Sequence, residues 1–306
     1  MRLEAVSERT PKLRRPFALG RLPPALPASF RHALADAMPS FCSRLAHAVA
    51  HAGAPLCVGL DPDPERLPVG FDASPASATA FCIAITDATR AVAAAYKPNL
   101  AFFEALGPGG ARALADVCAH VRTTGRLLVL DGKRGDIGNT GRRYATALYE
   151  QLDGDAATVA PYMGEDSVTP FLDHAGRCAF VLVATSNPGA AAVQSLDVGG
   201  RPLSHHVADL AQTWAHGRPG ELGFVVGATQ PQALASLRAL APDAPFLVPG
   251  VGAQGGSVRD VLAANGGGPL LVNASRAVLY ASDGADFAQA AADAAARLAD
   301  LLRAAM

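Results

Sequence analysis

The feature that most constrains the fold is an alternation that begins near residue 55. Short apolar runs rich in β-forming residues are followed repeatedly by longer Ala- and Leu-rich stretches with helical periodicity. The strand candidates are 56–61, 94–99, 127–131, 156–160, 179–185, 223–227, 246–250 and 270–273. The helix candidates are 77–93, 110–123, 139–152, 203–215, 231–240, 257–263 and 286–304. Eight such units favour an α/β fold with a single (β/α)8 TIM barrel, although a doubly wound open sheet produces a similar pattern.

Length and composition fit one large soluble domain. The 306 residues are within the range of a single barrel, and 50% of them are hydrophobic. With 26 basic and 27 acidic side chains, the chain lacks the excess charge that favours nucleic acid or an anionic membrane as a partner. The five scattered cysteines form no C-x-x-C pair, which indicates small core residues in a reducing cytoplasm. Apolar runs such as 179–184 are far shorter than the roughly 20 residues of a membrane span.

The first 37 residues differ in character from the rest. Prolines in Arg-Arg-Pro, Leu-Pro-Pro and Leu-Pro-Ala interrupt any regular period, and no secretory signal is recognisable. We expect a disordered or misassigned N-terminal extension over 1–37 and a barrel domain over 38–306. Because Met38 precedes a helix-like segment at 40–51, translation from Met38 is an alternative. Acidic residues and prolines disfavour a mitochondrial presequence.

Polar side chains follow many of the predicted strands. Asp61, Lys97, Asp131 and Ser186 each lie at or just beyond a predicted strand end. The carboxyl ends of the strands in a parallel barrel form one mouth, where active sites are built. We therefore expect these side chains to converge at the mouth.

Lysine is scarce in this chain. Of the 26 basic residues, only Lys12, Lys97 and Lys133 are lysine. Arginine does not release its proton at ordinary pH, whereas lysine is compact and has a tunable pKa. Lys97 and Lys133 are therefore candidates for chemistry, the alternative being that a few lysines occur anywhere by chance.

The segment Asp131-Gly132-Lys133 separates two charged residues by one. If the strand continues through both, their side chains point to the same face and can contact each other and a shared ligand. Asp136 follows in a turn before the helix predicted near residue 139, where an aspartate is equally typical of a helix N-cap. Such a charge pattern by itself also occurs in solvated surface loops.

Two later segments are typical of a phosphate site. The glycine-rich run 249–256 follows the seventh predicted strand and leads into a helix, so its backbone N–H groups can approach an anion closely. Residues 273–276, after the eighth strand, add the guanidinium of Arg276. Barrels commonly bind phosphate through these two loops. The alternative is a glycine-rich turn beside a surface arginine.

Together these blocks resemble the orotidine 5'-phosphate decarboxylase family, in the group with the signature Asp-Gly-Lys-Arg-Gly-Asp-Ile-Gly-Asn/Ser-Thr. The signature is intact at 131–140, and the resemblance extends from Met38 to the last helix. Similar blocks are Val-Gly-Leu-Asp-Pro at 58–62, Tyr-Lys-Pro-Asn at 96–99, Thr-Ser-Asn-Pro-Gly at 185–189 and the loop at 249–256. Asn-Ala-Ser-Arg at 273–276 departs from the commonest form, so only Arg276 is carried over.

The resemblance implies conversion of orotidine 5'-monophosphate to UMP and CO2 in pyrimidine biosynthesis, without a metal or organic cofactor. It implies a catalytic charge network of Lys97, Asp131, Lys133 and Asp136. The implied substrate-binding residues are Asp61, Ile137, Thr140, Ser186, Pro249, Gln254 and Arg276. Asp61 would bind the ribose hydroxyls, Ser186 and Gln254 would lie near the pyrimidine, and Arg276 would bind the phosphate. The other subunit of a homodimer with shared active sites would supply Asp136, Ile137 and Thr140.

Two other functions compete with this interpretation. A related barrel enzyme that acts on a sugar phosphate through Mg²⁺ and an enediolate would need an additional carboxylate pair for the metal. Ser186, Gln254 and the Arg-Gly pair at 134–135 favour a nucleotide instead. A non-catalytic phosphate-binding barrel is the second competitor, and the retention of Lys97 and Lys133 in a lysine-poor chain argues against it.

Overall fold

The computed structural model describes residues 39–251 and 256–306, and the expected extension at 1–37 lies outside them. Eight parallel strands form a closed barrel in the order β1-β10-β9-β8-β5-β4-β3-β2. The strands are β1 (Leu56–Leu60), β2 (Ala95–Pro98), β3 (Leu127–Arg134), β4 (Ala156–Val159), β5 (Cys178–Ala184), β8 (Glu221–Val226), β9 (Phe246–Pro249) and β10 (Leu270–Ala274). Because β1 pairs with both β2 and β10, the predicted barrel is confirmed and the open sheet is excluded.

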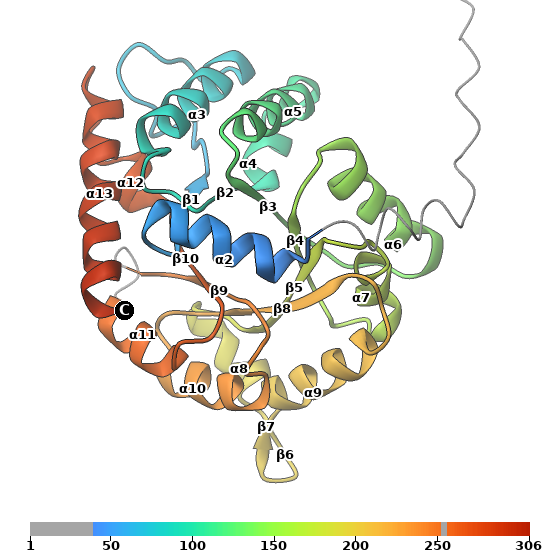
Figure 1. Ribbon diagram of the computed structural model, residues 1–306. Helices are drawn as coiled ribbons and strands as arrows, with labels where there is room; N and C mark the ends of the chain where they lie inside the picture. The colour runs from blue at the N-terminus through green and yellow to red at the C-terminus, as the bar shows by residue number, and fades with distance from the viewer. Residues whose placement is uncertain (1–38, 252–255) are drawn as a thin grey trace, which may run out of the picture. The chain divides into compact units, whose positions relative to one another are not determined.

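Helices surround the strands (Figure 1). The longer ones are α2 (Phe41–Ala52), α3 (Pro75–Thr89), α5 (Pro108–Thr123), α6 (Gly138–Ala145), α7 (Glu165–Leu172), α9 (Leu203–Ala215), α10 (Pro231–Leu240), α11 (Val258–Asn265) and α13 (Phe287–Ala305). Shorter elements are α4 (Leu100–Glu104), α8 (Ala191–Gln194), α12 (Arg276–Leu279), the 3-10 turn η2 (Pro188–Ala190) and the hairpin of β6 (Asp197–Val198) and β7 (Arg201–Pro202). No helix in the part of the chain that the structure describes is long and apolar enough to cross a membrane.

Apart from the short elements α4, η2, α8 and α12, which were not predicted, two helical segments differ from the sequence prediction. The helix expected at 139–152 begins as α6 but continues as a π-helix, η1 (Thr146–Gln151). Both Leu148 and Tyr149 in η1 are buried, and the Tyr149 hydroxyl donates to the carbonyl of Cys178. Helix α7 was not predicted, because Gly164 before it and Pro170 within it are typical of a loop.

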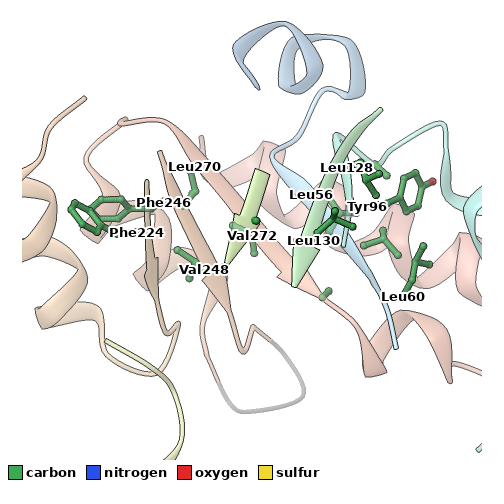
Figure 2. Packing of buried hydrophobic residues seen from close by; sticks show 14 of the residues in the cluster. Leu56, Leu60, Tyr96, Leu128, Leu130, Phe224, Phe246, Val248, Leu270 and Val272 are labelled. Carbon is green, nitrogen blue, oxygen red and sulfur yellow. The ribbon is translucent and has the colours of Figure 1, made fainter. Parts of the chain in front are cut away.

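Alternate residues of each strand pack into two different cores. Side chains such as Cys57, Ala95 and Val129 point into the barrel, where they form one cluster with residues of α2. Their neighbours along the strands, such as Leu56 and Leu128, point outward and pack against the helices. Figure 2 shows part of this outer cluster. Both faces of the strands are therefore buried, which explains why the strands read as nearly continuous apolar runs.

Helix α2 lies across the end of the barrel where the strands begin (Figure 1). Phe41 and Leu45 are almost completely buried in the inner cluster, and the Phe41 ring packs edge-on against Phe180 with centroids 5.8 Å apart. Each of these side chains contributes about 1.5 to 3 kcal/mol through burial. The Glu221 carboxylate accepts the N–H groups of Phe41 and Cys42 at the start of the helix. Helix α2 thus closes this end, which we call the base.

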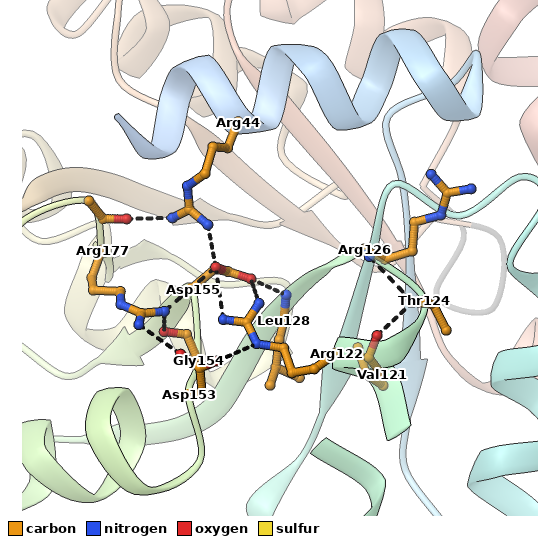
Figure 3. Close-up of polar contacts among 11 residues, drawn as sticks. Arg44, Val121, Arg122, Thr124, Arg126, Leu128, Asp153, Gly154, Asp155 and Arg177 are labelled. Carbon is orange, nitrogen blue, oxygen red and sulfur yellow. Dashed lines mark hydrogen bonds and ion pairs between the residues drawn. The ribbon is translucent and has the colours of Figure 1, made fainter. Parts of the chain in front are cut away.

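The buried carboxylate of Asp155 connects helix α2 to other elements of the base through ion pairs. Asp155 has no exposed surface and pairs with Arg44 of α2 and with Arg122 of α5, the second pair at 2.6 Å. Arg177 Nη1 lies 3.6 Å from Asp155 Oδ1, and the Leu128 backbone N–H donates to Asp155 Oδ2 at 2.8 Å. Figure 3 shows this cluster. The opposite end of the barrel, where the strands finish, remains as the mouth.

Candidate active site

A cavity of about 170 Å³ opens at the mouth of the barrel. It lies at or just beyond the carboxyl ends of β1, β2, β3, β9 and β10, as predicted from the polar residues at strand ends. The residues that line it are Asp61, Lys97, Asn99, Asp131, Pro249, Gly250, Val251, Asn273, Ser275 and Arg276. Charged and amide side chains from distant parts of the sequence therefore meet in one small hollow.

The strongest feature of the cavity is a network of two lysines around one aspartate. Lys97 Nζ lies 2.6 Å from Asp131 Oδ2, and Lys133 Nζ lies 2.6 Å from Asp131 Oδ1. The side chains of Lys97 and Asp131 are 5% and 9% exposed, whereas that of Lys133 is 50% exposed. Strand β3 continues through Lys133, which was the condition for the two charges to meet, although its pairing with β4 is irregular between Leu130 and Arg134. Lys133 is the more exposed ammonium group of the network, and although it does not itself line the cavity, it contacts Asp131, which does.

The charges in this network stabilise one another. Burial alone would lower the pKa of Lys97, but the carboxylates of Asp131 and Asp61 raise it above its ordinary value. Burial would likewise raise the pKa of Asp131, yet the ammonium groups of Lys97 and Lys133 hold it well below its usual range. Lys97 and Asp131 therefore stay charged at neutral pH, and the cavity holds a fixed field before any ligand binds.

Two further polar side chains of the cavity each have an oxygen atom without a hydrogen bond to any described residue. Asp61 Oδ1 and Asn273 Oδ1 are buried and have no hydrogen-bond partner among residues 39–251 and 256–306. Buried polar atoms are nearly always hydrogen-bonded in folded proteins, so such atoms in a cavity indicate places for ligand donors. Asp61 was a predicted binding residue. Asn273 was not, although its position at the end of β10 was a sufficient signal.

The loop after β10 brings Arg276 to the cavity. Arg276 is the first residue of α12, and Ser275 precedes it against β1. A side chain at Gly59 would meet Ser275 Oγ at 1.9 Å, so the absence of a Cβ at Gly59 allows this close approach. Pro249 also lines the cavity, at the end of β9. Gln254, the other residue predicted in that loop, lies outside the described residues.

The remaining predicted residues lie beyond the cavity lining of this chain. Asp136 accepts the N–H of Ile137 at 2.8 Å, and the N-cap of α6 is Ile137 rather than Asp136, so the simple N-cap alternative is wrong. Ile137 is 52% exposed, and Thr140 is exposed on α6. Ser186 follows β5 and lies against Gly227, where a Cβ would come within 2.8 Å of it. Of the predicted site residues, Asp61, Lys97, Asp131, Pro249 and Arg276 line the cavity among the residues that the structure describes.

Thr158, which is not among the predicted site residues, lies on β4 and is 2% exposed. Its hydroxyl donates to Asp131 Oδ1 at 2.9 Å and accepts the backbone N–H of Lys133 at 2.9 Å. The sequence pattern of 156–160 predicts an apolar strand and does not by itself mark Thr158 as a site residue. Side chains alternate between the two faces of a strand, so the available signal was that Thr158 is a polar residue at a position facing the barrel interior.

Two larger hollows, of about 530 and 620 Å³, lie beside α2 at the base. The first is lined mainly by Ala, Leu, Val, Pro and Gly residues. The second contains Arg44, Arg122 and Arg126, whose guanidinium groups already bind Asp155, Asp153 or backbone carbonyls. The mouth cavity is smaller than either, but it is the one in which charged groups converge on open space.

Comparisons with known proteins identify the family to which the sequence and the fold are similar. A family model described as Orotidine 5'-phosphate decarboxylase / HUMPS family matches residues 54–291. The orotidine 5'-phosphate decarboxylase of Roseiflexus castenholzii is 48% identical over 255 residues, which are 82% of this chain and 93% of that protein. Leishmania donovani OMP decarboxylase has a TM-score of 0.75 and 39% identity, over 88% of this chain and 100% of that one. Leishmania donovani UMP synthase has a TM-score of 0.78 and 40% identity, but this chain covers only 57% of it.

Proposed function

Since the chain belongs to the orotidine 5'-phosphate decarboxylase / HUMPS family, we propose that the mouth of its barrel decarboxylates orotidine 5'-monophosphate to UMP. The observation that carries the proposal is the network of Lys97, Asp131 and Lys133 at the cavity. The activity is that of a carboxy-lyase in pyrimidine biosynthesis, and the chemistry proposed below needs no cofactor.

Lys133 is the central group of the proposed mechanism. Loss of CO2 from C6 of the pyrimidine leaves a carbanion that no adjacent group delocalises, so the barrier must fall mainly through electrostatics. The Lys133 ammonium would stabilise the developing charge at C6 and then give C6 the proton that completes UMP. An arginine in this position would keep the charge but not release the proton.

Asp131 and Lys97 prepare the field in which Lys133 acts. Asp131 holds both ammonium groups by hydrogen bonds of 2.6 Å, so their positions are set before substrate arrives. We place the substrate carboxylate next to Asp131, where repulsion would raise the energy of the bound substrate. This repulsion contributes less than the field of Lys133.

The other predicted residues would bind parts of the substrate remote from C6. We assign Asp61, after β1, to the ribose hydroxyls and Arg276, after the neighbouring strand β10, to the phosphate, because both line the cavity. Ser186 and Gln254 would lie near the pyrimidine, and Pro249 would contact the substrate from β9. Binding energy from these remote groups can be used for positioning at the reacting carbon.

We further propose a cytoplasmic homodimer with shared active sites. Asp136 is the fourth charge expected in the network, but its carboxylate binds the N–H of Ile137 in its own chain. The exposed Ile137 and Thr140 offer a surface beside it that a second subunit would cover. In the dimer, Asp136, Ile137 and Thr140 of each chain would complete the partner's site. All five cysteines are free thiols, in keeping with a reducing compartment.

The test is turnover of orotidine 5'-monophosphate by the purified full-length chain, with and without EDTA. We expect the substrate absorbance to fall as UMP forms, at the same rate in both conditions. Lys133→Ala, prepared in parallel, should be inactive. Absence of UMP formation would favour the non-catalytic barrel, and turnover lost in EDTA would favour the metal-dependent relative.

A further inference from the structure

The β3–β4 pairing is interrupted at the residues that carry the charge network. Leu130 pairs with Ala157, and the next pair is Arg134 with Val159. Between these pairs, three residues of β3, numbered 131–133, lie opposite the single residue Thr158 of β4. Such a bulge re-aims side chains and leaves backbone groups of the longer strand without ladder partners.

The backbone of the bulge is strained at Lys133. Its φ is +45°, in the left-handed region that a non-glycine residue seldom adopts. A conformation of this kind persists only where the surroundings enforce it. Asp131, at the other end of the bulge, still forms a bridge to Asn99 beyond β2, so that end is held by the neighbouring strand. The Lys133 end needs another support.

The hydroxyl of Thr158 provides that support and links both ends of the bulge. It accepts the Lys133 backbone N–H at 2.9 Å, replacing the bond that the ladder does not supply. The same hydroxyl donates to Asp131 Oδ1, the oxygen that also receives Lys133 Nζ. One buried side chain therefore contacts the backbone of one charged residue and the carboxylate of the other.

We propose that Thr158 is a positioning residue, which holds the bulge and thereby directs the Lys133 ammonium toward the cavity. The proposal rests on the proposed function only for its effect on turnover. Thr158 acts through Asp131 and Lys133 rather than on the substrate. Its removal should therefore reduce the rate of the chemical step while leaving nucleotide binding nearly unchanged.

Thr158→Val keeps the shape of the side chain and removes the hydroxyl, whereas Thr158→Ser keeps the hydroxyl. Thr86→Val is the matched control, because the equally buried Thr86 hydroxyl donates only to the carbonyl of Cys82 within α3. We expect kcat of Thr158→Val to fall at least about tenfold while Kd for UMP changes less than about threefold. Thr158→Ser and Thr86→Val should each stay within about threefold of the parent kcat.

Amide hydrogen exchange tests the bulge independently of catalysis. The chain has only three lysines, so ¹⁵N-lysine labelling reports the amides of Lys97 and Lys133 with little overlap. In Thr158→Val the Lys133 amide loses its acceptor and should exchange at least about tenfold faster, while the Lys97 amide within β2 keeps its parent rate.

Parent-like kcat or unchanged Lys133 exchange in Thr158→Val would overturn the proposal. So would a Thr158→Ser protein as slow as Thr158→Val, or an equal loss in Thr86→Val. If the parent chain forms no UMP, the proposed function fails, and the exchange rate of the Lys133 amide still decides whether Thr158 holds the bulge.

Discussion

The two ends of the barrel each contain a buried aspartate with cationic partners, but they use different cations. At the base, Asp155 is surrounded by Arg44, Arg122 and Arg177. At the mouth, Asp131 is held between two lysines. An arginine keeps its proton and binds carboxylates through a planar fork, whereas a lysine can deliver a proton from a compact group. The choice of cation separates an end built for stability from an end built for chemistry.

The two ends also differ in completeness. All cationic partners of Asp155 belong to the same chain, and the Leu128 N–H satisfies the carboxylate further. At the mouth, Asp61 and Asn273 each have a buried oxygen atom without a hydrogen-bond partner among the described residues. Asp136 is turned to its own backbone there. The Asp155 carboxylate is thus satisfied on both oxygens, although Arg44 Nε beside it has no hydrogen-bond partner among the described residues, while the unpaired oxygens at the mouth belong to a cavity that a ligand can enter.

Among the variants that test the difference between mouth and base, we expect the largest loss of activity from Lys133→Arg. The variant gives the mouth the cation of the base, so charge is kept while the deliverable proton is lost. We expect kcat to fall at least about a thousandfold, about 4 kcal/mol in the barrier, while the folded protein still binds UMP in calorimetry. A kcat within about tenfold of the parent, or about 1.4 kcal/mol, would show that Lys133 is not the proton donor.

Asp155→Asn should produce a large loss of stability with little loss of activity. The variant removes a fully buried carboxylate charge from three partly exposed arginines, two of which still pair with Asp153, so we expect a cost of about 3 kcal/mol, the low end for a broken buried ion pair. Chemical denaturation measures the change, and kcat per folded molecule should remain within about twofold of the parent, because the mouth is unaltered. Asp116→Asn is the control, since Asp116 pairs with Arg112 on an exposed helix face. Its free energy of unfolding should fall by about 0.5 kcal/mol or less. Equal stability of the two variants would contradict the role of the base.

Arg276→Ala should have a smaller and substrate-dependent effect. A charged phosphate contact is worth about 1.5 to 3 kcal/mol, so kcat/KM for orotidine 5'-monophosphate should fall about ten- to a hundredfold. Residual turnover of orotidine, which has no phosphate, should hardly change. Arg297→Ala, on the exposed face of α13, is the matched control and should leave both substrates unaffected. An equal loss on both substrates would remove Arg276 from the phosphate site.

Much of the fold and of the mouth could be predicted because the relevant signals are local. Apolar runs with helical stretches between them identified all eight strands, and polar residues at strand ends identified Asp61, Lys97 and Asp131 as neighbours. The scarcity of lysine singled out Lys97 and Lys133 before any contact was known. Periodicity locates the end of each strand, and in a parallel barrel the last residues of all strands lie at the same end.

The parts that could not be predicted depend on tertiary contacts. The π-helical turn η1 follows from the simultaneous burial of Leu148 and Tyr149, which no helical propensity encodes. The bulge opposite Thr158 depends on the register between two strands, and an apolar run does not reveal register. Whether Asp136 acts in its own chain or in a partner's is likewise a question of assembly, which spacing leaves open.

Mixed dimers test most directly whether the mouth, unlike the base, is completed by a second chain. Lys133→Ala and Asp136→Ala proteins, each inactive, are unfolded together, refolded in equal amounts and allowed to pair at random, so about half the dimers are mixed. If Asp136 acts in the partner's site, each mixed dimer has one site without a lesion, and about a quarter of parental activity returns.

Lys97→Ala mixed with Lys133→Ala is the control, because both lysines contact Asp131 of their own chain and every site keeps a lesion. We expect recovery of about a quarter of parental activity for the first mixture and none for the second. It is contradicted if native mass spectrometry finds mixed dimers of Lys133→Ala with Asp136→Ala and the mixture stays as inactive as its parents.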